Sequence, residues 1–275
     1  MDKKEIYMPY LPVDKLDELL DFAETGDFKN SVYKGGTAMY LPFDDNFGVL
    51  YSLLFQTNKG DNNFVTTEEF KKTIEEVWQI YTRGGKVAPV LGYAKGPEGE
   101  GIRNIGYNGK DDGGNRDVVF VARAPGQTLN DTTYSKRWYR KTRERLQGPD
   151  SHYDEVVDTF LQILDSQIRP DITGNNILHH PVAGFNFIDF NKPHDSYYQN
   201  DTQLQTHRFL KSFILQKGFP NESLKQEYRK DAAKEQKILV NKLYNSGVIK
   251  EEYLEAAISH IPVLGVTKID ELDYV

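Results

Sequence analysis

The hydrophobic pattern of the chain changes its period near residue 154, and this change limits the folds open to it. Before that point, short apolar runs such as Ala38–Phe43 and Val49–Phe55 alternate with turn residues, which is typical of antiparallel strands. From Asp154 onward, apolar residues recur every three or four positions, as they do in amphipathic helices. A β-rich half followed by a helical half predicts an α+β fold with two lobes.

One helix is predicted inside the β-rich half. Thr66 and Glu69 form a capping-box pattern, and an apolar stripe runs from Phe70 to Tyr81 before Gly84-Gly85 ends the helix. Residues 95–116 hold seven glycines and are expected to form an exposed loop between two strands. The other elements expected in this half are a helix over Val13–Phe22 and strands over Ser31–Tyr33, Val87–Tyr93 and Val118–Ala122.

The helical half contains one predicted interruption. Two short β-like runs, Ile177–Leu178 and Phe185–Phe190, are separated by Pro181 and Gly184, so they are expected to pair as a hairpin. The expected helices are one from Asp154 to about Ile168, then Leu204–Leu215, Leu224–Tyr244 and Glu251–His260. We therefore divide the chain into an N-terminal lobe (1–124), a C-terminal lobe (125–220) and a helical extension that packs on or near it (221–275).

Composition excludes several classes of function. The 275 residues include no cysteine, which rules out thiol catalysis, disulfides and thiolate zinc sites. The net charge is −7, whereas a general nucleic-acid binder normally needs a basic face. No apolar run approaches the ~18 residues of a membrane helix, so no membrane span is expected.

The densest group of chemically useful side chains lies around the predicted hairpin. Asp171 comes before it, Asn176 opens its first strand, and Asp189 follows its second strand. Two strands of one hairpin hold Asn176 and Asp189 side by side, which offers oxygen ligands to a hard cation such as Mg²⁺. Asp171 would then stand where a group that accepts a hydroxyl proton belongs.

This order matches the protein-kinase catalytic loop, D-x-x-x-x-N, followed by a hydrophobic-D-F turn. The simpler alternative is that Asp171 caps a turn, Asn176 is a loop amide and Asp189 ends a strand. We favour the kinase interpretation because features upstream follow the same order. They are Lys34, Gly35, Gly36 and Thr37 as the phosphate-covering turn, Glu75 or Glu76 on the predicted helix, and backbone groups of Ala122 and Ala124 for adenine.

On these residues the chain resembles the small type III-secreted bacterial effector kinases of the OspG/NleH kind, from about Ser31 to Leu215. The resemblance rests on Gly36-Thr37-Ala38, Arg123–Gly126, Asp171–Leu178 and Ile188-Asp189-Phe190. It implies a bilobal kinase-like fold, ATP with Mg²⁺ or Mn²⁺ as cofactors, and secretion into a host cell. A host protein would then be the substrate or activator; the oligomeric state is not indicated.

The sequence also departs from the kinase pattern. Pro170 replaces the arginine that would bind an activation-loop phosphate, and Asn191 replaces the glycine of D-F-G. The predicted third strand, Val49–Phe55, lacks the lysine that pairs with the α- and β-phosphates. Lys34 or Lys59 could supply that charge from another backbone position. A second explanation is that the predicted register of this strand is wrong. A third is that the protein is a pseudokinase or binds nucleotide in an unusual orientation.

Two further groups stand outside this pattern. The basic run Tyr134–Arg145 is expected to be a solvated helix face, with docking of an acidic partner or phosphorylated substrate as the alternative. His179 and His180, with His194 further on, are interpreted as loop histidines, because adjacent positions of a strand point to opposite faces and cannot share an ion.

The leading hypothesis is an ATP-dependent phosphotransferase that acts on Ser or Thr of a host protein. One alternative is a pseudokinase that recruits a host partner as a binding module. The other is a kinase-fold enzyme with a small-molecule acceptor or with nucleotidyl-transfer activity. The sequence does not choose the acceptor, because acceptor specificity depends on surface shape.

Overall fold

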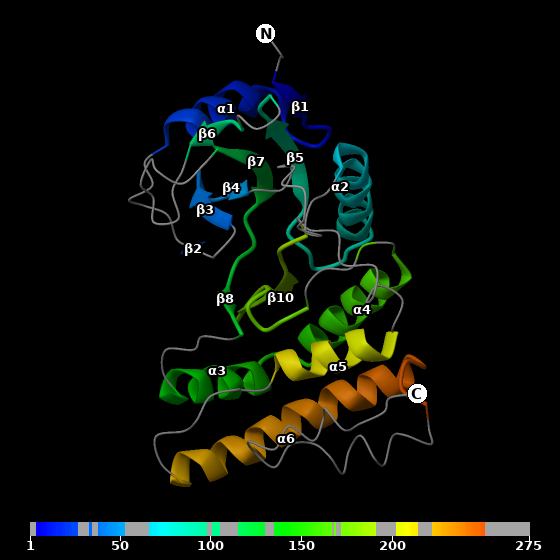
Figure 1. Ribbon diagram of the computed structural model, residues 1–275. Coiled ribbons are helices and arrows are strands. Elements are labelled where there is room, and N and C mark those ends of the chain that lie inside the picture. The colour runs from blue at the N-terminus through cyan, green and yellow to red at the C-terminus, as the bar shows by residue number, and fades with distance from the viewer. Residues whose placement is uncertain are drawn as a thin grey trace, which may run out of the picture.

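The computed structural model shows a β-rich part and a helical part joined by a small second sheet (Figure 1). It describes residues 4–26, 33–34, 38–52, 66–97, 101–104, 115–129, 135–166, 168, 172–190, 202–213 and 222–250. The β-rich part followed by the helical part confirms the predicted α+β, two-lobed architecture. Within the described ranges no helix is both long and apolar enough to cross a membrane.

The β-rich part is one antiparallel sheet with the strand order β1-β5-β7-β4-β3-β2, and β6 pairs with β7 outside this path. Helix α2 (Thr67–Thr82) lies between β4 and β5 in the chain, as expected for the N-terminal lobe of a kinase-like fold. The strands are β1 (Glu5–Tyr7), β2 (Tyr33–Lys34), β3 (Ala38–Pro42), β4 (Phe47–Ser52), β5 (Val90–Lys95), β6 (Arg103–Asn104) and β7 (Asn115–Ala122).

The two faces of this sheet pack against different helices. On one face, Val49 and Tyr51 of β4 are buried in a cluster with α1 (Leu16–Thr25), and the Tyr51 hydroxyl donates to the Ala23 carbonyl oxygen at 2.8 Å. The 3₁₀ turn η1 (Val13–Lys15) precedes α1. On the other face, Val119 and Tyr93 belong to a second cluster that includes the buried side of α2. Because successive side chains of a strand alternate between faces, β4, β5 and β7 contribute to both clusters.

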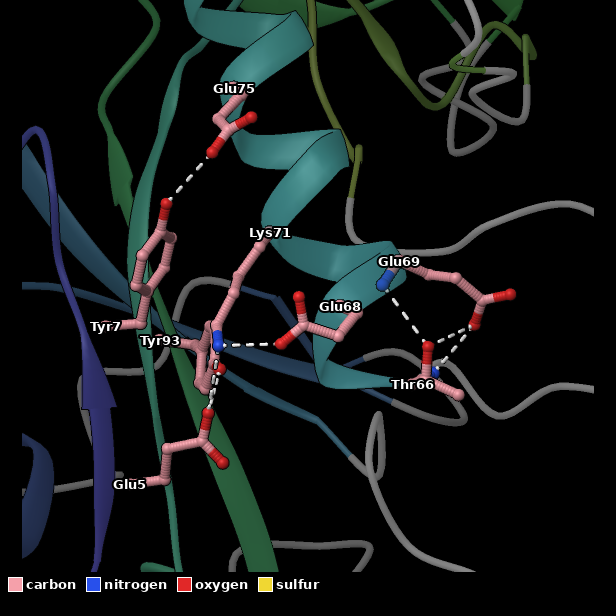
Figure 2. A network of polar contacts seen from close by, with 8 residues as sticks. All are labelled: Glu5, Tyr7, Thr66, Glu68, Glu69, Lys71, Glu75 and Tyr93. Carbon is pink, nitrogen blue, oxygen red and sulfur yellow. Dashed lines mark hydrogen bonds and ion pairs between the residues drawn. The ribbon is translucent and has the colours of Figure 1, made fainter.

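Helix α2 begins with the predicted capping box and is held by the N-terminal strand (Figure 2). The Glu69 amide donates to the Thr66 hydroxyl at 3.2 Å, and the Thr66 amide donates to the Glu69 carboxylate at 2.8 Å. These bonds lower the pKa of Glu69. One turn later, Lys71 lies 3.0 Å from Glu68 and 3.6 Å from Glu5 of β1. Strand β1 was not predicted from the sequence. It holds α2 in place through the ion pair between Glu5 and Lys71.

The connection from α2 to β5 ties the two parts together. The Lys86 amide donates to the Thr159 hydroxyl at 2.8 Å, and the Lys86 carbonyl accepts from the Phe187 amide at 2.8 Å. The Ala88 amide in turn donates to the Phe187 carbonyl at 2.8 Å. The buried cluster on the α2 side continues through this connection into the helical part, so both parts share one core.

The helical part consists of α3 (Ser135–Gln147), α4 (Ser151–Asp165), α5 (Thr202–Ser212) and α6 (Glu222–Asn245), with α6 lying beneath the others in Figure 1. Leu239, Val240 and Leu243 of α6 are buried in the shared core. The expectation that the basic run Tyr134–Arg145 is a solvated face is wrong for its last residue. Arg145 is fully buried and pairs with Glu235 of α6, because α6 covers this side of α3.

A small sheet lies between the two parts, with the strand order β10-β9-β8. Its strands are β8 (Gln127–Thr128), β9 (Ile177–His180) and β10 (Gly184–Phe187), so the predicted hairpin is present. His179 and His180 lie in β9 rather than in a loop, a correction to the sequence prediction. They pair with Phe185 and Gly184 in the β9–β10 register, and the His179 ring packs on the Phe185 ring at 4.8 Å.

The environment of His179 predicts a loss of stability in acid. Burial, and then the nearby positive charge of Arg145, lower the pKa of His179 to about 3. An unfolded histidine takes up a proton near pH 6.5, so between about pH 6.5 and pH 3 the unfolded state binds one more proton than the folded state. The free energy of unfolding therefore decreases as the pH is lowered through this window, by up to about 1.4 kcal/mol per pH unit.

Urea denaturation at a series of pH values tests this prediction. Relative to the wild type, a His179→Leu variant should lose less stability between neutral pH and about pH 4, because it no longer titrates in this window. Equal losses in the two proteins would show that His179 is not protonated with this effect.

Candidate functional site

The chain brings Asn176 next to the segment that carries Asp189. A tight turn, in which the Asn176 amide donates to the Thr173 carbonyl at 2.9 Å, leads into β9. The Ile188 amide then donates to the Asn176 carbonyl at 2.9 Å and extends the β9–β10 pairing by one residue. Asp189 follows directly, so the amide and carboxylate predicted as metal ligands come from neighbouring backbone positions.

The backbone of Asp189 has an unusual conformation. Its φ of 69° makes it the one non-glycine residue with positive φ in the part of the chain that the structure describes. Aspartate tolerates this left-handed region better than most residues, but such geometry persists only where the surroundings enforce it. Here Phe190 is 2% exposed and belongs to the shared core, while Asp189 itself is exposed. The buried Phe190 and the paired Ile188 therefore hold Asp189 at the surface.

Several predicted site residues lie outside the described residues. Asp171, the predicted catalytic base, is among them, as are the predicted phosphate-covering residues Gly35, Gly36 and Thr37 and the alternative cation Lys59. The backbone of Lys34 is described in β2, where its register partner is Met39 of β3.

Strand β4 offers no positive charge to a nucleotide. It corresponds to the predicted third strand, and its register with β7 pairs Leu50 with Val119 and Gly48 with Val121. Leu50 packs against the core cluster on the α2 side, whereas Val49 belongs to the opposite cluster. The side chain that β4 directs toward α2 at this point is therefore a leucine, where a kinase needs its phosphate-pairing lysine.

A tyrosine covers the neighbouring position of the same strand. A Cβ atom built on Gly48 would lie 2.3 Å from the Tyr40 hydroxyl oxygen and 2.4 Å from its Cε2 atom. The ring of Tyr40 therefore rests directly on the Gly48 backbone, and it is half-buried there. This role of Tyr40 was not predicted, because nothing in the sequence of a single strand shows which side chain a neighbouring glycine will accommodate.

The two glutamates of α2 make contacts with other parts of the chain. Glu76, the predicted partner of a phosphate-binding lysine, accepts a hydrogen bond from the Ile168 amide at 3.1 Å. Ile168 lies three residues before Asp171 in the sequence. Glu75 accepts from the Tyr7 hydroxyl of β1 at 3.2 Å (Figure 2). Glu76 thus connects α2 to the segment before the predicted catalytic loop.

The predicted adenine-binding segment follows β7. The Ala122 amide donates to the Pro89 carbonyl at 2.9 Å, and the Arg123 amide donates to the Asn46 carbonyl at 2.8 Å. The Ala122 amide is therefore already used within the protein and is not available to adenine. Ala124 follows in the open segment that leads to β8.

The donor set at Asn176 and Asp189 fits a Mg²⁺ or Mn²⁺ ion that arrives with a nucleotide. Magnesium sites in phosphotransferases typically use one or two protein oxygen ligands and complete their shell with phosphates and water. In the described ranges, including this hairpin, no group of three or more His, Asp or Glu side chains lies close enough to hold a metal ion. The chemistry available at this point is therefore metal-assisted transfer to an acceptor, provided that a nucleotide binds.

Comparisons with known proteins find remote structural similarity to kinase domains and a phosphotransferase. No protein-family model matches the chain, and no curated protein matches its sequence. Among solved structures, the pseudokinase domain of BIR2, an immune regulator of the RLK/Pelle family, is 13% identical with a TM-score of 0.46, and the match covers 98% of this chain and 84% of that one. The maize SIRK1 kinase domain bound to AMP-PNP is 11% identical with a TM-score of 0.41, over 98% and 89% of the two chains.

An AMP-bound spectinomycin phosphotransferase is more distant, 12% identical with a TM-score of 0.30, over 96% of this chain and all of the other. Because these similarities are remote, the kinase-like assignment rests on the features of this chain itself. They are the strand order, the position of α2, and the β9–β10 hairpin with Asn176 and Asp189 at its end.

The position of Tyr40 predicts an effect on nucleotide affinity. If adenine binds against the face of β3 and β4 that carries Tyr40, the ring must first move off Gly48, and this displacement weakens binding. A Tyr40→Ala variant should therefore bind ATP with Mg²⁺ about threefold to tenfold more tightly than the wild type. Isothermal titration calorimetry measures this, with Tyr81→Ala, at an exposed position of α2, as the control. Unchanged or weaker binding by Tyr40→Ala would show that adenine does not use this face.

Proposed function

We propose that the protein is an ATP-dependent phosphotransferase that acts on Ser or Thr hydroxyls of a protein. The observation that carries this proposal is the pairing of Asn176 with Ile188, which sets Asp189 beside Asn176 with an enforced left-handed backbone. A left-handed backbone is costly for an aspartate that merely ends a strand. A carboxylate and an amide from neighbouring backbone positions are ligands of the kind that metal-assisted phosphoryl transfer uses.

In this proposal each residue has one task. The Asn176 and Asp189 side chains would hold Mg²⁺ or Mn²⁺, and the bound Mg²⁺–ATP complex supplies a γ-phosphate whose charge is partly neutralised. Asp171 would orient the acceptor hydroxyl and accept its proton. Gly35, Gly36 and Thr37 would cover the phosphates, and Ala122 and Ala124 would offer backbone groups to adenine. Because Leu50 carries no charge, Lys34 or Lys59 would have to supply the cation near the phosphates.

The second part of the proposal concerns the class of acceptor and the location of the protein. The resemblance of Asp171–Leu178 and Ile188-Asp189-Phe190 to the OspG/NleH effector kinases supports a host protein as acceptor and secretion into a host cell.

A second candidate is a pseudokinase that serves as a binding module, and specific observations favour it. Leu50 stands where the phosphate-pairing lysine is needed, the Tyr40 ring rests on Gly48, and Glu76 accepts a hydrogen bond from a backbone amide. A thermal-shift assay separates the two candidates, because ligand binding to the folded state raises the melting temperature. A raised melting temperature with ATP and Mg²⁺ favours the enzyme; no change favours the module.

The product of the reaction tests the proposal itself. The purified protein is incubated with a protein acceptor and with ATP labelled at either the γ- or the α-phosphate, and the labelled residue is identified after acid hydrolysis. We expect γ-label on phosphoserine or phosphothreonine. Incorporation of α-label alone would contradict the proposal and indicate nucleotidyl transfer, while label on an added small-molecule alcohol but not on protein would indicate a different acceptor class.

A further inference from the structure

The hydrogen bond of Glu76 joins the β-rich part of the fold to the chain that leads to the predicted base. The Glu76 Oε2 atom accepts from the Ile168 amide at 3.1 Å. Ile168 comes two residues after the C-cap of α4 and three residues before Asp171 in the sequence. A carboxylate on α2 thus holds the backbone of the helical part just before the predicted catalytic loop.

The chain around the predicted base is anchored in the core on both sides. Ile168 and Ile172, which flank residues 169–171 in the sequence, are both buried and belong to the shared core cluster. After Ile172, the Thr173 carbonyl accepts from the Asn176 amide at 2.9 Å. Because a few residues span only about 3.5 Å each, the position of Ile168 limits the positions open to the residues that follow it.

The backbone of Ile168 is bonded through both of its polar groups. The Ser166 hydroxyl, at the end of α4, donates to the Ile168 carbonyl at 3.4 Å, and the Ile168 amide donates to Glu76. Burying an amide without an acceptor is unfavourable. The present position of Ile168 is therefore stabilised as long as residue 76 offers an oxygen atom.

Helix α2 gives Glu76 a firm support. Its first turn carries the capping box, and Lys71 pairs with Glu5 of β1 (Figure 2). Val77, next to Glu76, is fully buried in the shared core, while the Glu76 side chain is half-buried. A side chain on a packed helix positions its hydrogen-bond partner more precisely than one on a loop.

We propose that Glu76 is a positioning residue, which orients the chain leading to Asp171 through its hydrogen bond with the Ile168 amide. Glu76 acts here as a hydrogen-bond acceptor and not as the partner of a phosphate-binding lysine, since β4 carries Leu50 where that lysine would be. This inference rests on the proposed function, in which Asp171 acts on the acceptor hydroxyl. Misplacing such a group slows the chemical step and leaves the affinity for ATP unchanged.

Two substitutions of Glu76 in the full-length protein separate these roles. Glu76→Gln removes the charge and keeps an oxygen acceptor, whereas Glu76→Leu removes both. In steady-state assays with γ-labelled ATP and a protein acceptor, Glu76→Leu should lower kcat by at least about tenfold, and Glu76→Gln should keep it within about threefold of wild type. The Kd of ATP with Mg²⁺, measured by calorimetry, should stay within about twofold in both. Glu68→Leu, at an exposed position of the same helix, is the matched control and should keep the wild-type kcat.

Amide hydrogen exchange followed by NMR tests the positioning without using activity. In Glu76→Leu the Ile168 amide should exchange at least about tenfold faster than in the wild type, because it has lost its acceptor. The amide of the buried Val119 in β7 should exchange at an unchanged rate, which shows that the fold as a whole is intact. In Glu76→Gln both amides should exchange within about threefold of wild type.

Each outcome decides the proposal. If Glu76→Gln loses as much activity as Glu76→Leu, or if both weaken ATP binding, the charge of Glu76 is what matters and the proposal is wrong. It is also wrong if the Ile168 amide of Glu76→Leu exchanges at the wild-type rate. A wild-type protein that transfers no phosphate would contradict the proposed function instead, and the exchange rates alone would then decide whether Glu76 holds this part of the chain.

Discussion

Replacing Glu235 with Leu is expected to lower the free energy of unfolding by about 3–5 kcal/mol. Glu235 is fully buried and accepts hydrogen bonds from Arg145 at 2.6 and 2.8 Å and from the Tyr153 hydroxyl at 2.8 Å. The variant leaves the Arg145 guanidinium buried without its counter-charge, and a buried unpaired charge is among the costliest defects a core can have. Urea denaturation followed by circular dichroism measures the effect.

The double variant Arg145→Met/Glu235→Leu is the matched control. It removes both charges and fills the space with apolar atoms, so it should recover most of the stability lost by the single variant. Glu18→Gln, which breaks the exposed pair with Lys15, should cost less than about 1 kcal/mol. A double variant as unstable as the single one would mean that the shapes of Arg145 and Glu235, rather than their charges, hold α3 and α6 together.

Replacing Asp189 with Ala is expected to lower the rate of phosphoryl transfer by at least about 10³-fold. In the proposed function Asp189 is the carboxylate ligand of the metal, and charge stabilisation by such an ion amounts to several kcal/mol in the transition state. The change should leave the fold in place, since Asp189 is exposed and the neighbouring Phe190 supplies the core contact. Steady-state assays with γ-labelled ATP measure the rate.

Two variants guard against a structural explanation of that result. Asp189→Asn keeps a residue that tolerates positive φ and removes the charge, so it should also lose most of its activity. Asp165→Asn removes a charge from an exposed position of α4 and should transfer phosphate like the wild type. If Asp189→Asn retains the wild-type rate, Asp189 does not bind the metal.

The parts of this fold that were predicted correctly depend on local patterns. The capping box at Thr66 and Glu69, and the hairpin around Pro181 and Gly184, are encoded within a few residues of one another. Strand β1 was missed because its three residues, Glu5–Tyr7, lack turn signals and are ordered by pairing with β5, about 90 positions away in the sequence. Tertiary pairing decides such short strands, and a single sequence does not record it.

The site shows the same division. The two β-like runs separated by Pro181 and Gly184 were sufficient to predict the hairpin between Asn176 and Asp189. The missing lysine of β4 was visible as the uncharged run that includes Leu50. Tyr40 over Gly48 was not predictable, because it depends on cross-strand register. The burial of Arg145 was not predictable either, since its partner Glu235 is 90 positions away. The basic run Tyr134–Arg145 was therefore predicted to be a solvated helix face, although Arg145 is buried.

The metal dependence of γ-phosphate transfer tests the central claim most directly. The wild-type protein is incubated with γ-labelled ATP and a protein acceptor, either in EDTA or with added Mg²⁺ or Mn²⁺. We predict no transfer in EDTA and transfer restored by either metal ion, because in the proposed site Asn176 and Asp189 act on ATP through the bound cation. Transfer that persists in EDTA, or no transfer under any condition in a protein whose melting temperature responds to ATP, would contradict the claim.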